Sequence, residues 1–115
     1  MGKCVDFDKV AAGSKLDVKF LYDLAQDFYA ANKDIIPSIK ESMSSKDYQS
    51  VSFYLHSIKN GADIIGAYKL SHLSSELEHC MSKNNVTDDS ISKLEFLYEL
   101  LEQVCQECLA VKELV

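Results

Sequence analysis

The sequence contains few of the residues that interrupt regular secondary structure. Among its 115 residues there are four glycines, a single proline and no tryptophan. Because glycine and proline most often end helices and strands, their scarcity argues against a loop-rich fold and favours long regular elements. Hydrophobic residues make up 47% of the chain, which is enough for a packed core and argues against disorder. A chain of this length fits one domain, which we expect to span residues 1–115.

Long apolar runs and basic clusters are also lacking. There is no run of about 18 apolar residues, so no transmembrane helix is predicted, and Met1–Asp8 lacks the apolar stretch of a signal peptide. The formal net charge is −6 and Lys and Arg form no cluster. Nucleic acids and anionic membrane surfaces both attract clustered basic residues, so neither is an expected partner. We therefore expect a soluble, cytoplasmic protein.

The cysteines form no pattern that predicts a disulfide framework. Without a secretory signal, Cys4, Cys80, Cys105 and Cys108 are expected to be reduced thiols. Cys105 and Cys108 lie within a helical apolar stripe, so we interpret them as small buried hydrophobic residues. Zinc bound by both of them together with His79 and Cys80 is the alternative. Since no second Cys-x-x-Cys or spaced His pair supports it, we predict no metal site.

Apolar residues recur at helical spacing in four segments. These run from about Leu16 to Ser44, from the turn at 44–47 to near Gly66, from Leu70 into Ser82–Asn85, and from Thr87–Ser90 nearly to the C-terminus. The expected core stripe of the second segment is Val51, Leu55, Ile58, Ala62 and Ile65, and that of the last is Ile91, Leu94, Tyr98, Leu101, Cys105 and Cys108. No segment alternates with period two, so no strand is expected. The connections between the last helices are short, which favours antiparallel neighbours. The sequence therefore predicts an all-α fold, an up-down antiparallel four-helix bundle.

Single residues predict where these helices begin, bend and end. Pro37 lies inside the first segment and predicts a kink or break there. Ser45 or Asp47 is expected to cap the second helix, whose end is expected near Gly66. A short extra helix at the N-terminus is compatible with the apolar content of Val10–Ala12.

His56 is the residue most suited to chemistry. It follows Leu55, which belongs to the apolar stripe of the second helix, and one residue is about 100° around the helix axis. His56 is therefore expected at the border between the core and solvent. Lys59 and Asn60 are its neighbours on the next turn, and Ser52 is its neighbour one turn back.

An exposed imidazole at this position suits a phosphoacceptor. Its neutral, nucleophilic form is available near neutral pH, and the ammonium of Lys59 would offset the charge of a phosphoryl group. Gly61 and Ala62 add little bulk, so we expect room for a partner. An exposed His followed by Lys is nevertheless common on helices and, on spacing alone, most often has no function. His72 and His79 lack the Lys and the small residues, and we interpret them as surface histidines.

The stretch around His56 resembles the signature of the histidine-containing phosphotransfer (HPt) domain family. That signature is His, any residue, an apolar residue, Lys, Gly and two small residues, with a Gly-Ala pair further on. The chain has His56–Ala62 followed by Gly66–Ala67. The stretch His56–Lys59 also resembles the phosphotransfer domain of chemotaxis kinases. The resemblance extends from about Asp17 to Leu114 and includes Asp47-Tyr48, Leu70, Leu73 and Leu77-Glu78.

The resemblance implies a carrier that works with partner domains. His56 would take a phosphoryl group from a histidine kinase or from the aspartate of a receiver domain and pass it to another receiver. Receivers of response regulators or hybrid histidine kinases would be the partners of a monomeric chain. The family has no ATP site and no cofactor of its own, so the chain is not expected to be an enzyme, and the receiver supplies Mg²⁺. Lys59 would orient and neutralise the phosphoryl group.

The expected docking surface surrounds His56. It includes Ser52, Asn60, Gly61, Asp63 and the exposed part of the first helix around Phe20–Asp27. Asn60 departs from the family, which usually has Gly directly after the Lys. This departure motivates an alternative function, a non-catalytic HPt-like adaptor that binds a receiver or kinase through the same face. The sequence leaves open which partner binds and in which direction the phosphoryl group moves, and whether the chain is free-standing or an excised module.

Overall fold

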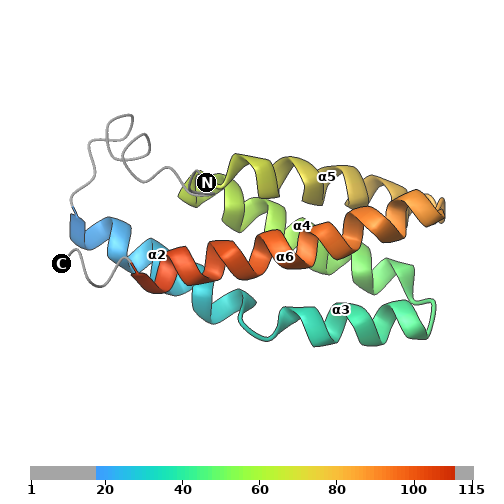
Figure 1. The fold of residues 1–115 in the computed structure, drawn as a ribbon, viewed down its shortest axis with the longest axis horizontal. Coiled ribbons are helices and arrows are strands. Elements are labelled where there is room, and N and C mark those ends of the chain that lie inside the picture. The colour runs from blue at the N-terminus through green and yellow to red at the C-terminus, as the bar shows by residue number, and fades with distance from the viewer. Residues whose placement is uncertain (1–17, 111–115) are drawn as a thin grey trace.

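The computed structural model describes residues 18–110, which contain five helices and no strand (Figure 1). The possible extra helix at the N-terminus lies outside these residues. The helices are α2 (Val18–Asn32), α3 (Ile35–Ser44), α4 (Tyr48–Ile65), α5 (Tyr68–Ser82) and α6 (Asp88–Ala110).

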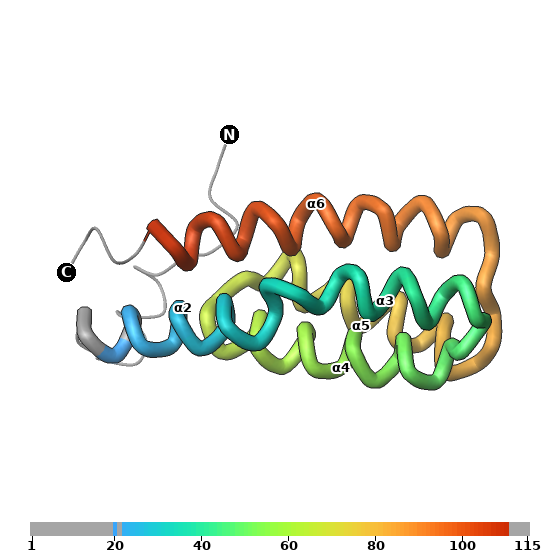
Figure 2. Tube along the Cα trace, turned by 90° about the horizontal axis from the view of Figure 1, so that it is seen from below, coloured from blue at the N-terminus to red at the C-terminus, as the bar shows by residue number. Residues whose placement is uncertain are grey.

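The five helices form a four-helix bundle because α2 and α3 together supply its first member. In Figure 2 these two helices lie end to end beside the long α6. The chain then reverses direction at each connection, so that α4, α5 and α6 run alternately along the bundle (Figure 1). The predicted all-α bundle is therefore confirmed, with a first helix that is broken rather than continuous.

The break in the first helix lies earlier than predicted. It falls at Lys33 and Asp34, while Pro37 is the third residue of α3. A proline ring clashes with the carbonyl four residues before it, which here belongs to Lys33. Within the first turn of a new helix, by contrast, the missing amide of proline costs nothing. Pro37 therefore ends α2 before its own position.

The ends of α4 are defined by local hydrogen bonds and by one glycine. Of the two predicted caps, Asp47 is the N-cap of α4, and its side chain accepts a hydrogen bond from the amide of Ser50 at 3.2 Å. The hydroxyl and amide of Ser50 lower the pKa of Asp47. Ser45 instead ends α3. Gly66 ends α4 in the left-handed conformation at φ 79°, which favours glycine.

The core lies along the predicted stripes, with one correction in α6. All five predicted core residues of α4 are buried, namely Val51, Leu55, Ile58, Ala62 and Ile65. In α6, Ile91 was assigned to the stripe, but it is 44% exposed, whereas Ser90 is buried. The buried stripe is centred between Leu97 and Leu101, and Ile91 lies about 100° from that centre. Ser90 lies on the centre line, and it exchanges hydrogen bonds with Thr87.

Candidate functional site

His56 lies in the middle of α4 with its ring in solvent. Of its side-chain surface, 57% is accessible, while the preceding Leu55 is fully buried. The helix begins eight residues earlier, at Tyr48, directly after the Asp47 cap, and runs without interruption to Ile65. The predicted position at the border of the core is therefore confirmed, and a rigid helix carries the imidazole.

The carboxylate of Glu78 is the direct partner of this imidazole. His56 Nδ1 lies 3.1 Å from both Oε1 and Oε2 of Glu78, which comes from the antiparallel neighbour α5. An ionised carboxylate only accepts hydrogen bonds, so Nδ1 carries the proton and donates it. In the neutral form of the ring, the other nitrogen, Nε2, then carries the lone pair. The contact with Glu78 therefore selects the tautomer whose nucleophilic atom is Nε2.

The contact between His56 and Glu78 was missed by sequence reasoning. Glu78 was noticed only as part of a family pattern. The two positions are 22 residues apart, and the end of α4 and the first turns of α5 lie between them, so their pairing depends on how the antiparallel helices are aligned. A usable signal is that Glu78 follows the buried Leu77, just as His56 follows the buried Leu55.

Lys59 lies one turn from His56, but its partner in the structure is Asp63. Its Nζ is 3.6 Å from Asp63 Oδ2, and the two side chains are 32% and 49% exposed. The other oxygen, Asp63 Oδ1, accepts a hydrogen bond from the hydroxyl of Ser71 in α5. Lys59 is thus paired with a carboxylate, and it makes no hydrogen bond or ion pair with His56.

Two other predicted docking residues differ in exposure. Asn60 is exposed, one turn after His56, as expected. Ser52 is half-buried one turn before it and lines a polar pocket of about 260 Å³ between the start of α4 and the end of α5. His72 and His79 are exposed on α5, as predicted for surface histidines. The face of α4 around His56 is therefore open on the Asn60 side and partly covered at Ser52.

The small residues after Lys59 pack against the rest of the bundle. A Cβ atom at Gly61 would lie 3.1 and 3.3 Å from two ring carbons of Phe28, and Ala62 is fully buried. The missing side chain of Gly61 therefore lets α2 pack closely against α4. On this side the space beside Gly61 is filled by Phe28, while the contact of Gly61 with a partner stays a prediction.

An apolar groove nevertheless runs between α2 and α4, next to His56. We call it the α2–α4 groove. Its volume is about 250 Å³, and it is lined by Leu24, Asp27, Phe28, Ala31, Asn32, Ser57, Gly61, Ile64 and Ile65. Near the groove, Phe53 is 71% exposed and Ile64 is 58% exposed on α4. Phe53 precedes His56 by three residues, so it lies one turn away on the same face.

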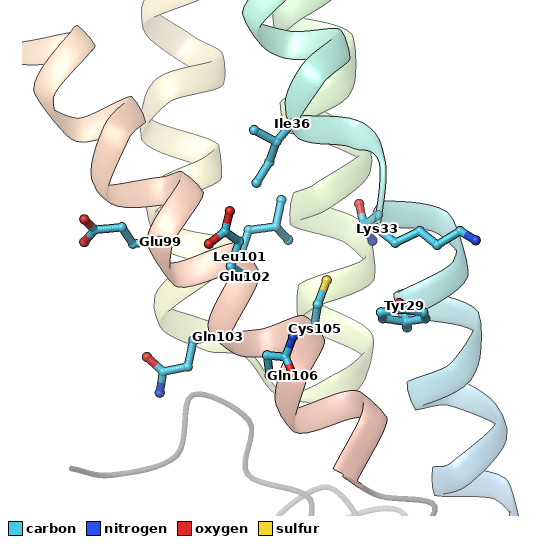
Figure 3. A pocket seen from close by; sticks show the side chains of 10 residues that line it. Tyr29, Lys33, Ile36, Glu99, Leu101, Glu102, Gln103, Cys105 and Gln106 are labelled. Carbon is cyan, nitrogen blue, oxygen red and sulfur yellow. The ribbon is translucent and has the colours of Figure 1, made fainter.

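A larger pocket lies away from His56. It has a volume of about 400 Å³ and is lined by Tyr29, Asn32, Lys33, Ile36, Glu99, Leu101, Glu102, Gln103, Cys105 and Gln106 (Figure 3). These residues belong to α2, α3, the break between them and α6, and none belongs to α4. The pocket is therefore separate from the histidine site.

The cysteines of α6 are buried, as predicted. Burial raises the pKa of the Cys105 thiol to about 11 and that of the Cys108 thiol to about 12. Both are thus neutral and unreactive near pH 7. Within residues 18–110, no group of three or more His, Cys, Asp or Glu side chains is placed to hold a metal ion. The zinc set considered from the sequence is therefore not assembled.

One comparison places the chain in a known family. A family model for the Hpt domain matches residues 23–107, which include all of α3, α4 and α5 and most of α2 and α6. Neither the curated proteins nor the solved structures yielded a match. None of the helices in the described part is long and apolar enough to cross a membrane. With an exposed histidine on the second member of a four-helix bundle, and with a family match over most of its length, the chain belongs to the Hpt domain family, whose members carry phosphoryl groups and are not kinases.

Proposed function

We propose that this chain is the histidine phosphotransfer protein of a multistep phosphorelay and that His56 is its phosphoacceptor. The observation that carries the proposal is the hydrogen bond between His56 Nδ1 and Glu78 at 3.1 Å. It selects the tautomer in which Nε2 is the nucleophile, on a ring that is 57% exposed.

The transfer reaction follows from this geometry. Nε2 of His56 attacks the phosphorus of an aspartyl phosphate on a receiver. As the N–P bond forms, the O–P bond breaks and the electron pair leaves with the receiver carboxylate. The imidazole keeps its Nδ1 proton and becomes cationic, and the charge of Glu78 stabilises this cation. When the next receiver takes the phosphoryl group, the N–P bond breaks and a neutral imidazole is the leaving group.

The remaining components are divided between the chain and its partner. Lys59 lies one turn from His56 and offsets the charge of the phosphoryl oxygens. In this proposal Mg²⁺ and the catalytic carboxylates belong to the receiver, and the chain has no ATP site or cofactor. It acts as a monomer in the cytoplasm, together with receivers of response regulators or hybrid histidine kinases.

The receiver docks over the α2–α4 groove. Its aspartate has to approach Nε2, so its surface covers the side chains around His56. On the α2 side these are the exposed Phe53 and Ile64, and burial of such apolar area is the main favourable contribution to association. Asn60, Asp63 and Ser52 form the polar rim of the same interface.

A labelling experiment tests the proposal. A phosphorylated receiver is incubated with the native chain, with His56→Gln and with His72→Gln, which removes another exposed histidine. We expect native chain and His72→Gln to be labelled equally, through an acid-labile and alkali-stable bond, and His56→Gln to remain unlabelled. Equal labelling of His56→Gln would refute the assignment. Receiver binding without labelling of the native chain would favour the non-catalytic adaptor.

A further inference from the structure

The carboxylate of Asp63 is held at two points. Asp63 Oδ1 accepts a hydrogen bond from the hydroxyl of Ser71, a residue that is only 6% exposed. Asp63 Oδ2 lies 3.6 Å from Lys59 Nζ. The buried hydroxyl fixes one oxygen on the α5 side, so the other oxygen stays directed at the lysine. Asp63 is thus a fixed negative charge rather than a freely moving surface carboxylate.

Lys59 lies between this carboxylate and the imidazole. His56, Lys59 and Asp63 follow one another at spacings of three and four residues along one side of α4. Lys59 is the only basic residue in α4 other than His56. A phosphoryl group on His56 and the carboxylate of Asp63 therefore compete for the same ammonium group.

We propose that Asp63 is a positioning residue that keeps Lys59 shared and thereby raises the tendency of phosphorylated His56 to give up its phosphoryl group. The inference rests on the proposed function of His56. A carboxylate that competes for the lysine makes the phosphoryl dianion less well neutralised. The direct repulsion between Asp63 and the phosphoryl group is weaker, because two helical turns span about 10 Å, close to the Debye length. Asp63 therefore acts chiefly through Lys59.

The test measures the equilibrium of phosphoryl transfer between the free chain and the free receiver. The constant of that equilibrium does not depend on how tightly the two proteins dock. The full-length native chain and Asp63→Asn are mixed with a phosphorylated receiver, and the ratio of phosphohistidine to aspartyl phosphate is measured. Asn keeps an oxygen for Ser71 and removes the charge. We expect Asp63→Asn to shift the ratio about two- to fivefold toward phosphohistidine, the scale of an exposed ion pair. Asp63→Ala, a second removal of the charge, is expected to shift it in the same direction.

Two further variants separate the mechanism from a general effect of charge. Asp89→Asn removes the carboxylate of another i,i+4 lysine pair, 3.3 Å from Lys93 on α6, and should leave the ratio unchanged. In a Lys59→Gln background, Asp63→Asn should have less than half of its original effect. An equal effect in that background, or a shift away from phosphohistidine, overturns the inference. Neither result contradicts the proposed function, because His56 is still labelled. Absence of label on native His56 would instead refute the proposed function.

Discussion

On the side of α4 that faces α5, the side chains around His56 are polar and hold one another. Glu78 binds the imidazole, and Asp63 is bound by Ser71 and Lys59. We call these residues the polar side. On the side that faces α2, Phe53 and Ile64 are exposed beside an apolar groove, and the ring of Phe28 lies against Gly61. We call these the apolar side.

The contrast indicates a division of roles along one helix. The polar side consists of groups whose charges and hydrogen bonds act on the imidazole, and each is held by a partner from the same chain. The apolar side consists of side chains exposed to water that gain free energy only when a partner covers them. We therefore expect changes on the polar side to alter the reaction, and changes on the apolar side to alter binding or packing.

The largest effect is expected for Glu78. Glu78→Ala leaves His56 without the acceptor that selects its tautomer, so the rate of phosphoryl acceptance should fall by about 10- to 100-fold. Glu78→Gln keeps an acceptor oxygen without the charge, so its rate of phosphoryl acceptance should fall less than that of Glu78→Ala. Single-turnover labelling by a phosphorylated receiver measures both rates. If receiver affinity falls instead of the labelling rate, the division between the two sides fails.

The second-largest effect is expected on the apolar side, where Phe53→Ser should weaken receiver binding. Phe53→Ser removes a ring that is 71% exposed and makes no part of the core, so the fold should be retained. Receiver affinity should fall about tenfold, the scale of one aromatic contact in an interface. Titration with an unphosphorylated receiver measures the affinity. Phe96→Ser is the matched control, because Phe96 is 47% exposed on α6, and its affinity should equal that of the native chain.

Packing between α2 and α4 provides a third test. Gly61→Val places atoms where the ring of Phe28 lies, 3.1 Å from the position of a Cβ. The free energy of unfolding should fall by about 1–3 kcal/mol, as is typical of overpacking. Denaturant melts of Gly61→Val with and without Phe28→Leu check the cause, because the smaller partner should recover part of the loss. Unchanged stability would mean that α2 is free to move away from α4.

The smallest effect is expected at the cap that begins α4 and so supports both sides equally. Hydrogen bonds from Ser50 lower the pKa of Asp47 from 3.8. A carboxylate with a lowered folded-state pKa contributes stability above its unfolded pKa and loses it as pH falls through the folded value. Asp47→Asn should therefore melt at a slightly lower temperature at pH 7, and the difference should vanish once the pH falls below the lowered folded-state pKa of Asp47. A difference that persists there would assign the stabilisation to something other than ionisation.

Local features of the sequence predicted most of the fold. The apolar stripe of α4 was predicted in full because five residues at helical spacing mark one face without ambiguity. Ile91 was misplaced because a single apolar residue near a helix end satisfies the spacing about as well as its neighbour. The break at Lys33 was placed at Pro37 because the steric effect of proline acts four residues earlier.

The histidine site was predicted only in part. The exposure of His56 follows from its angle to Leu55, which depends on one helix alone. The roles of Glu78, Ser71 and Phe28 could not be obtained in this way, since each depends on the alignment of another helix with α4. The same reason explains why the packing of Phe28 against Gly61 was not predicted.

By itself, the sequence determined the all-α class, the four members of the bundle, the end of α4 near Gly66 and the outward position of His56. These depend on backbone sterics and on the 3.6-residue period, which act within one segment. Only the tertiary structure decided that Glu78 holds Nδ1, that Ser71 binds Asp63, and that Phe28 fills the space beside Gly61. These contacts join residues from different helices, and their geometry is set by how the whole core packs.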